Sequence, residues 1–290
     1  MEFTVRASLR RVLNGQRDVA TQRRWVERLA GFTHVPRGLQ RRTSELGGRP
    51  AEWIAPKGKL EDPPRVLYLH GGGWVLGSPR TARPIAGGLA RRLDAPVVSL
   101  DYRLAPEHPF PAAPDDVHRA YLDLRAQLGP DAPIAVAGDS AGGNMAVGLA
   151  LRLRDEGREL PSALGLISPG ADFTQPRSET DTDAMMTAAW VNQVMELYVA
   201  GRDLRDPRLS CALGDASGLP PAMIQVAGQE LLRLDAEALY SAMHDAGVEV
   251  CLEVYRSMWH DFQVQAGLLC TADRALDELA RFIESAAAEG

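Results

Sequence analysis

The sequence is poor in cysteine, in long apolar runs and in unbalanced charge. Its 290 residues include only three cysteines, Cys211, Cys251 and Cys270, and their odd number and wide spacing argue against a disulfide framework or a zinc site. No apolar run approaches the ~20 residues that a membrane-spanning helix needs. The net charge of −6 is too small to indicate an acidic tail or a nucleic-acid partner.

These absences predict a protein with one buried core in a reducing compartment. Residues 1–16 lack the apolar stretch of a secretory signal, so we expect a cytoplasmic protein without stable membrane insertion. Residues 1–50 carry a net charge of +7, but acidic residues interrupt the arginines, which favours a solvated helical face over an anionic partner. The sequence leaves a homodimer open.

From residue 65 onward, short apolar runs alternate with helical patterns. This alternation predicts an α/β fold with a mostly parallel sheet covered by helices on both faces. The expected strands are 66–70, 97–102, 134–138, 163–169, 222–228 and 248–255. The expected helices are 81–93, 115–127, 141–156, 235–246 and 273–287. An amphipathic helix at 17–32 and a hairpin of 41–46 with 51–55 precede them.

One stretch, residues 171–219, interrupts the alternation. It contains a helical pattern at 184–200 between polar loops and no apolar strand. We therefore predict that residues 1–40 and the insertion 171–219 form a small helical cap, while 41–170 and 220–290 form the two parts of the α/β domain.

A G-x-S-x-G motif, Gly138-Asp139-Ser140-Ala141-Gly142, lies between an expected strand and an expected helix. A nucleophilic serine needs such a tight strand-to-helix turn, because strained backbone angles then project its hydroxyl from the sheet edge. Gly138 and Gly142 would remove side chains that collide in the turn. An N-capping serine between glycine spacers is the alternative, but the strand–turn–helix context favours Ser140 as a nucleophile.

The segment His70-Gly71-Gly72-Gly73-Trp74 follows the expected strand at 66–70. Glycine amides in such a loop can approach a developing oxyanion, and losing one donor costs ~2.7–4 kcal/mol. We expect the amides of Gly71, Gly72 and Ala141 to form this oxyanion hole. His70 precedes the nucleophile, so a structural role for its ring is expected.

Where the nucleophile lies in a G-x-S-x-G turn of this kind, the triad residues follow in the chain order Ser, acid, His. The general base is therefore expected after Ser140. Of the two histidines there, His244 lies in a helical pattern, whereas His260 follows the last expected strand and is the predicted base. The acid should follow the strand 222–228, which leaves Glu230 and Asp235. Glu230 is nearer the strand end, and Asp235 is suited to N-cap the next helix, so Glu230 is preferred.

Four segments together resemble the bacterial hormone-sensitive-lipase family of esterases, an α/β-hydrolase family. They are HGGGW at 70–74, DYRLAPEHPFPA at 101–112, GDSAGGN at 138–144 and MWHDFQ at 258–263. The resemblance covers roughly residues 60–290 and implies a mixed eight-stranded sheet, a helical cap, and a triad of Ser140, Glu230 and His260. The family's acid is more often an Asp followed by Pro-Leu, where this chain has Glu230-Leu231-Leu232.

The predicted function is serine-dependent hydrolysis of short- to medium-chain carboxylic esters through an acyl-enzyme, with neither metal nor organic cofactor. The expected partner is a small ester. Five residues are expected at the substrate pocket: Trp74, Trp190, Val191, Leu197 and Tyr198. An amidase or arylacetamide-type deacetylase shares this chemistry and stays an alternative. A non-catalytic receptor of the same fold is a further one, although it would not need both Ser140 and His260.

Overall fold

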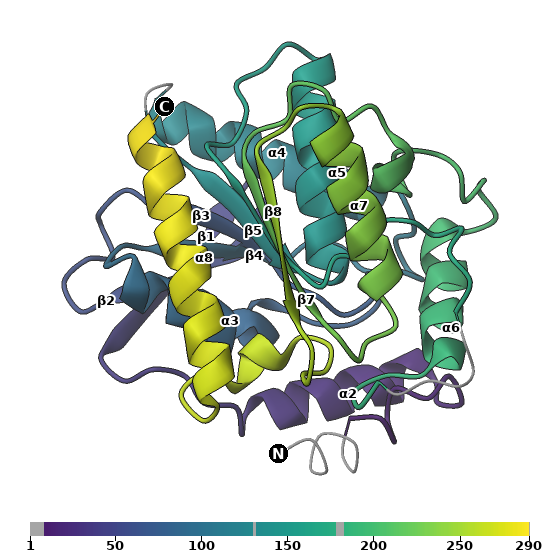
Figure 1. The fold of residues 1–290 in the computed structure, drawn as a ribbon. Helices are drawn as coiled ribbons and strands as arrows, with labels where there is room; N and C mark the ends of the chain where they lie inside the picture. The colour runs from purple at the N-terminus through teal and green to yellow at the C-terminus, as the bar shows by residue number, and fades with distance from the viewer. Residues whose placement is uncertain (1–8, 130–131, 178–182, 290) are drawn as a thin grey trace.

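The computed structural model describes residues 9–129, 132–177 and 183–289 and contains one eight-stranded sheet (Figure 1). Across the sheet the strands follow the order β1-β2-β4-β3-β5-β6-β7-β8. Their bounds are β1 Leu39–Leu46, β2 Arg49–Pro56, β3 Val66–Leu69, β4 Val97–Leu100, β5 Ala135–Asp139, β6 Leu164–Ile167, β7 Ala222–Ala227 and β8 Val250–Tyr255. All the expected strands are present.

The sheet is mostly parallel. β1 and β2 form the predicted hairpin, β2 runs antiparallel to β4, and every other neighbouring pair is parallel. β3 and β5 are in register with Leu69 opposite Gly138, and Gly138 is opposite Leu166 on β6. The carboxyl ends of these central strands therefore meet at one edge, where open α/β sheets place their ligand sites. The predicted fold class is confirmed.

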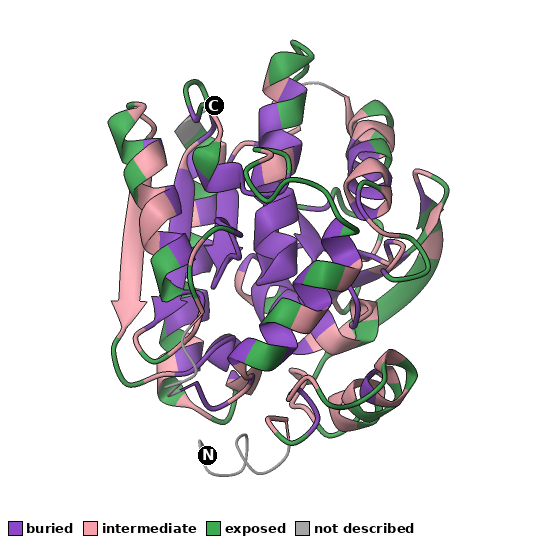
Figure 2. Ribbon diagram, turned by 90° about the vertical axis from the view of Figure 1, so that its right-hand side faces the viewer, coloured by how far each residue is buried: buried purple, intermediate pink, exposed green. Residues whose placement is uncertain are grey.

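Helices cover both faces of the sheet. α3 and α8 lie on one face, and α4, α5 and α7 lie on the other (Figure 1). The bounds are α2 Val19–Ala30, α3 Pro79–Arg92, α4 Ala112–Leu128, α5 Ala141–Asp155, α6 Ala188–Val199, α7 Arg233–Asp245 and α8 Cys270–Glu289. Two short 3₁₀ helices are η1 Cys211–Leu213 and η2 Phe262–Gln265. Each face has its own apolar core, and the central strands are buried on both sides (Figure 2).

Two helices far apart in the sequence, α2 and α6, are joined by their side chains. Gln22 accepts a hydrogen bond of 2.7 Å from the indole Nε1 of Trp190 and donates one of 3.0 Å to Gln193 Oε1. α6 begins four residues later than expected because Thr187 caps it, accepting from the Trp190 amide. These contacts link the two predicted parts of the cap.

The cap boundaries themselves stay a prediction. Residues 1–8 and 178–182 of the predicted cap lie outside the described residues. Within 171–219, η1 packs against α5 and α7 of the α/β domain. Across the described residues, no helix is long and apolar enough to cross a bilayer, and no group of three His, Cys, Asp or Glu side chains is arranged to hold a metal.

Candidate active site

Ser140 lies at the joint between β5 and α5, in a strained backbone conformation with φ 52° and ψ −114°. Its amide donates 2.8 Å to the Ile167 carbonyl on β6, which holds the joint against the sheet. A Cβ on Gly142 would lie 1.9 Å from the Leu69 carbonyl oxygen, and one on Gly138 would lie 2.6 Å from the Gly142 backbone. The motif glycines are therefore required by close backbone approach, as predicted for this turn.

Asp139 ties the glycine loop after β3 to the nucleophile turn. Its Oδ1 accepts 2.6 Å from the Tyr68 hydroxyl, and its Oδ2 accepts 2.9 Å from the Gly71 amide. The Gly71 amide is thus already engaged, contrary to its expected role as an oxyanion donor. The amides of Gly72 and Gly73 donate to no acceptor in the part of the chain that the structure describes. The amides of Gly72 and Gly73 are therefore the ones in this loop that are available to an oxyanion.

The ring of His70 braces the same loop. It stacks on Tyr102 with ring centroids 4.1 Å apart, and its Nδ1 lies 2.8 Å from the Gly71 carbonyl. Burial lowers the pKa of His70 to about 4, although the Gly71 hydrogen bond acts in the opposite direction. A neutral, stacked imidazole fits the expected structural role.

Glu230 and His260 are brought together by the loops after β7 and β8. Glu230 Oε1 lies 3.3 Å from His260 Nδ1, and both side chains are almost fully buried. The other oxygen, Oε2, accepts from the Ser168 hydroxyl at 2.7 Å and the Ala227 amide at 2.9 Å. The carboxylate is thus fixed by two donors and oriented toward the imidazole.

The second nitrogen of His260 faces a neighbouring carboxylate. Nε2 lies 3.1 Å from Oδ2 of Asp261, a residue with a left-handed φ of 52°. No hydrogen bond joins Ser140 Oγ to His260 among the described residues, although both residues line one cavity. Asp261 Oδ1 is buried without a partner in the described chain. The structure therefore contains an Asp261–His260 contact that the sequence did not indicate.

The sequence suggested that Asp235 N-caps α7, but the N-cap of this helix is Leu232. Asp235 lies in the first turn of that helix, where its Oδ1 accepts from the Ala171 and Asp172 amides at 3.1 and 3.0 Å. It also pairs with Arg177, whose Nη2 lies 2.8 Å from Oδ1 and whose Nη1 contacts Oδ2. Both side chains are buried, so this carboxylate is committed to Arg177 and the chain after β6.

The buried charges around His260 favour its protonated form. Burial acts to lower the pKa of His260, but the carboxylates of Asp261 and Glu230 outweigh it and hold that pKa well above its ordinary value. Burial, reinforced by Asp261, raises the pKa of Asp139 to about 7. Burial also raises the pKa of Asp183, near the same cluster, to about 6. The acidic side chains around His260 thus stabilise its charged form.

Two cavities meet at Ser140, Met186 and Trp190. The larger one, of about 140 Å³, contains His260 and has mostly apolar walls from α2, α3 and the segment before α2. The smaller one, of about 20 Å³, lies on the side of Gly73 and α6 and does not include His260. The larger cavity is lined by Leu9, Leu13, Val26, Leu29, Leu76, Ile85 and Met185, among others.

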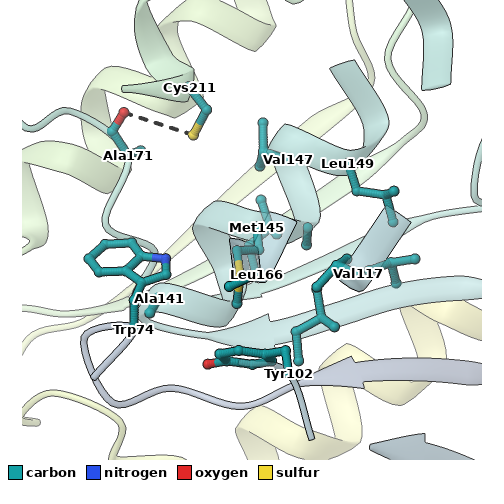
Figure 3. Close-up of a cluster of buried hydrophobic side chains, with 14 of the residues drawn as sticks. Trp74, Tyr102, Val117, Ala141, Met145, Val147, Leu149, Leu166, Ala171 and Cys211 are labelled. Atoms are coloured by element: carbon teal, nitrogen blue, oxygen red, sulfur yellow. Dashed lines mark hydrogen bonds between the residues drawn. The ribbon is translucent and has the colours of Figure 1, made fainter. Parts of the chain in front are cut away.

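Three of the expected pocket residues, Trp74, Trp190 and Val191, line the smaller cavity. Tyr198 lies behind Trp74, stacked on it with ring centroids 4.5 Å apart, and Leu197 is not among the lining residues of either cavity. Trp74 belongs to the same buried cluster as Ala141, at the start of α5 (Figure 3).

Sequence reasoning missed Arg177 and Asp261. Arg177 lines the smaller cavity, and Asp261 contacts the predicted base. The only signal for Asp261 was its position beside His260. The only signal for Arg177 was a basic residue in the predicted cap insertion.

Comparisons with known proteins identify the family and the fold of the chain. Residues 66–264 match the family model described as alpha/beta hydrolase fold. The chain is 39% identical over 249 residues to an acetyl-hydrolase of Streptomyces hygroscopicus, covering 84% of this chain and 83% of the relative. It is 39% identical over 212 residues to the carboxylesterase NlhH of Mycobacterium tuberculosis, covering 69% of this chain and 66% of the relative. A crystal structure of an esterase from the bacterial hormone-sensitive lipase family superposes with a TM-score of 0.91 at 35% identity, covering 98% and 97% of the two chains.

Proposed function

The chain belongs to the alpha/beta hydrolase family, among the bacterial hormone-sensitive-lipase esterases, and is a carboxylesterase; we propose that Ser140, His260 and Glu230 are its catalytic triad. The observation that carries this assignment is that the strained Ser140 turn and the His260 imidazole line the same cavity. The buried Glu230 carboxylate orients this imidazole, with Oε1 3.3 Å from Nδ1. No other carboxylate in the described chain contacts His260 Nδ1.

The mechanism has two acyl-transfer steps. Ser140 Oγ attacks the ester carbonyl carbon while His260 takes the hydroxyl proton, and Glu230 stabilises the imidazolium. The alcohol leaves with the proton that His260 returns to it, which gives an acyl-enzyme. A water molecule then attacks the acyl carbonyl by the same route, releasing the acid and restoring Ser140.

For this chemistry His260 Nε2 must face Ser140, and Asp261 now contacts that nitrogen at 3.1 Å. We propose that the Asp261 side chain turns to another rotamer when substrate enters, which frees Nε2 for Ser140. Ser140 and His260 already line the same cavity.

The developing oxyanion is assigned to the amides of Gly72, Gly73 and Ala141. Gly72 and Gly73 lie on the loop beside Ser140 and have no acceptor within the described residues. The Ala141 amide is at the first position of α5, where no intrahelical acceptor exists and the helix dipole favours negative charge. Gly71 supports this loop through Asp139.

The two cavities suggest how an ester would lie. His260 must protonate the leaving alcohol, so the alcohol belongs in the larger cavity that contains His260. The acyl group then enters the smaller cavity, whose 20 Å³ is little more than the space of one water molecule. Small acyl groups such as acetyl fit there, whereas the apolar walls of the larger cavity suit a bulky apolar alcohol.

An acyl-chain series tests the proposal. We expect kcat/KM for p-nitrophenyl esters to be highest for the acetate and to fall with each carbon added to the acyl chain, because longer chains require Met186 and Met195, which line the smaller cavity, to move. Ser140→Ala is the blank and should retain the fold while losing at least about a thousandfold in kcat. A maximum at the palmitate, or activity that survives in Ser140→Ala, would contradict the assignment.

We propose a cytoplasmic location on the basis of the cysteines. All three are free thiols, and burial raises the pKa of Cys211 to about 12, which makes this thiol unreactive. A measurement of the molecular mass in solution tests whether the chain forms the homodimer that the sequence leaves open.

A further inference from the structure

The smaller cavity contains two buried N–H donors without an acceptor. Arg177 Nε and Trp74 Nε1 make no hydrogen bond in the described part of the chain, and both residues line this cavity beside Ser140. The Arg177 side chain is 3% exposed, and Trp74 as a whole residue is 5% exposed. A buried donor without a partner is uncommon and costs stability, so such groups are expected to serve a ligand or a reaction.

The Arg177 donor is held in place by the rest of its guanidinium. Nη1 and Nη2 bind the buried Asp235 carboxylate, and Nη2 also donates 3.2 Å to the Asp172 carbonyl. A guanidinium is planar and has five N–H donors, so these contacts fix the direction of the remaining Nε–H. Trp74 is fixed equally well, because its indole stacks on Tyr198 at an interplanar angle of 8°.

The charge balance of the cavity favours a neutral acceptor over an anion. Asp235 already neutralises Arg177 within the buried pair. A carboxylate on the ligand would therefore meet no uncompensated positive charge and would have to be desolvated at high cost. A hydroxyl, ether or keto oxygen would accept from the two donors without that penalty.

We propose that the smaller cavity is an acyl subsite for esters of 2-hydroxy acids, with Arg177 and Trp74 donating to the oxygen on the carbon next to the ester carbonyl. This inference rests on the proposed function, which directs the acyl group into this cavity. The cavity's volume of about 20 Å³ limits the substituent to roughly one heavy atom, and a hydroxyl has that size.

The chemistry balances without a further reactant. Ser140 Oγ bonds to the carbonyl carbon of the 2-hydroxyacyl group, and the alcohol leaves with the proton from His260. Water then cleaves the acyl-enzyme and releases the 2-hydroxy acid. The 2-hydroxyl takes no part in bond making, so its effect is on binding of the acyl group in both steps.

The test compares phenyl glycolate with phenyl propanoate, two esters of similar size that differ only by a hydroxyl group in place of a methyl group on the carbon next to the carbonyl. Each kcat/KM is divided by the rate constant of the same ester with hydroxide, which removes the difference in intrinsic reactivity. We expect the corrected value for glycolate to exceed that for propanoate by about tenfold or more, because a site with paired donors discriminates against an analogue that leaves them unsatisfied. Phenyl acetate is measured alongside.

Two variants connect the preference to the donors. Trp74→Phe removes Nε1 and keeps an aromatic ring against Tyr198, and Arg177→Lys removes Nε and keeps a cation beside Asp235. Each should lower the glycolate-to-propanoate ratio several-fold. Trp53→Phe is the matched control, since Trp53 Nε1 donates to Ser44 on the distant hairpin; its ratio should equal that of the wild type. If Arg177→Lys fails to fold, the glycolate-to-propanoate ratio of Trp74→Phe alone tests the proposal.

Equal corrected values for glycolate and propanoate would overturn the proposal, as would a preference that persists in every folded variant. In both cases hydrolysis of phenyl acetate would leave the esterase assignment standing. Failure to hydrolyse any of the three phenyl esters would instead refute the proposed function itself, and this inference with it.

Discussion

Asp261 offers the most direct test of the arrangement around His260. Its Oδ2 lies 3.1 Å from Nε2, the nitrogen that the mechanism assigns to Ser140. Asp261→Asn keeps the size of the side chain and removes its charge. We expect this change to lower the pKa of His260 and to move the acid limb of the kcat/KM profile to lower pH.

The sign follows from the role of the imidazole. A protonated His260 cannot accept the Ser140 proton, so activity should rise as the pH passes the pKa of His260 in the free enzyme. Burial opposes the charged imidazole, but Asp261 and Glu230 hold its pKa well above the ordinary value. Without the Asp261 charge the imidazole becomes neutral, and therefore competent, at lower pH.

The magnitude can be bounded from the contact distance. Two unit charges 3.1 Å apart interact by about 5 kcal/mol at an effective dielectric constant of ~20. Since one pKa unit corresponds to about 1.4 kcal/mol, the shift cannot exceed about four units. Asp139 reduces it, because its own pKa of about 7 is raised by burial and by Asp261 and would fall in the variant. We therefore expect a net shift of about one to two units.

The assay is a pH-stat measurement of phenyl acetate hydrolysis between about pH 5 and 10, on wild type and variant. Asp277→Asn is the matched control, since Asp277 is a half-exposed carboxylate on α8 that pairs with Arg92. An acid limb that stays in place or moves to higher pH would refute the reasoning. Loss of activity at every pH would show that Asp261 is needed for turnover and does not merely compete for His260.

Two further pairs of variants test the acid assignment and the nucleophile turn. Glu230→Gln should lower kcat by about 10²–10⁴ with little change in melting temperature, because it removes the group that orients the imidazole. Asp235→Asn should instead destabilise the fold by about 3–5 kcal/mol in urea unfolding, because it leaves the buried Arg177 charge unpaired; the reverse pattern would exchange their roles. Gly142→Ala should cost about 2–3 kcal/mol of stability or more, since its Cβ would lie 1.9 Å from the Leu69 carbonyl oxygen. Gly148→Ala in the same helix meets no atom within 4 Å and should be neutral or stabilising, so an equal loss in both variants would refute the steric argument.

The fold was predictable because apolar runs and helical patterns alternate clearly from residue 65 onward, outside the insertion 171–219. Strands β3, β5 and β6 are buried throughout, and buried parallel strands appear in a sequence as short continuous apolar runs. The element boundaries were less predictable, because capping side chains and turns decide them. Thr187 delays the start of α6, and Ser78 begins α3 two residues earlier than the apolar pattern suggests.

The choice among three consecutive glycine amides could not be made from the sequence. It depends on which amide the Asp139 carboxylate reaches. That in turn depends on the register of β3 and β5, which aligns Leu69 with Gly138 and so sets Asp139 beside Gly71. A pattern of residue types carries no information on this alignment, so the sequence could not show that the Gly71 amide is bound by Asp139, and we propose Gly73 in its place.

The position at which α7 begins distinguishes the roles of Glu230 and Asp235. The sequence suggested a helix that starts at residue 235, with Asp235 as its cap. The helix in fact begins at Arg233, which moves Asp235 into the first turn and lets its carboxylate reach back to the chain after β6 and to Arg177. A carboxylate that is buried and paired there is not available to orient His260. The same shift of two residues therefore leaves Glu230 as the acid that we propose, and it fixes the guanidinium that we assign to the acyl subsite.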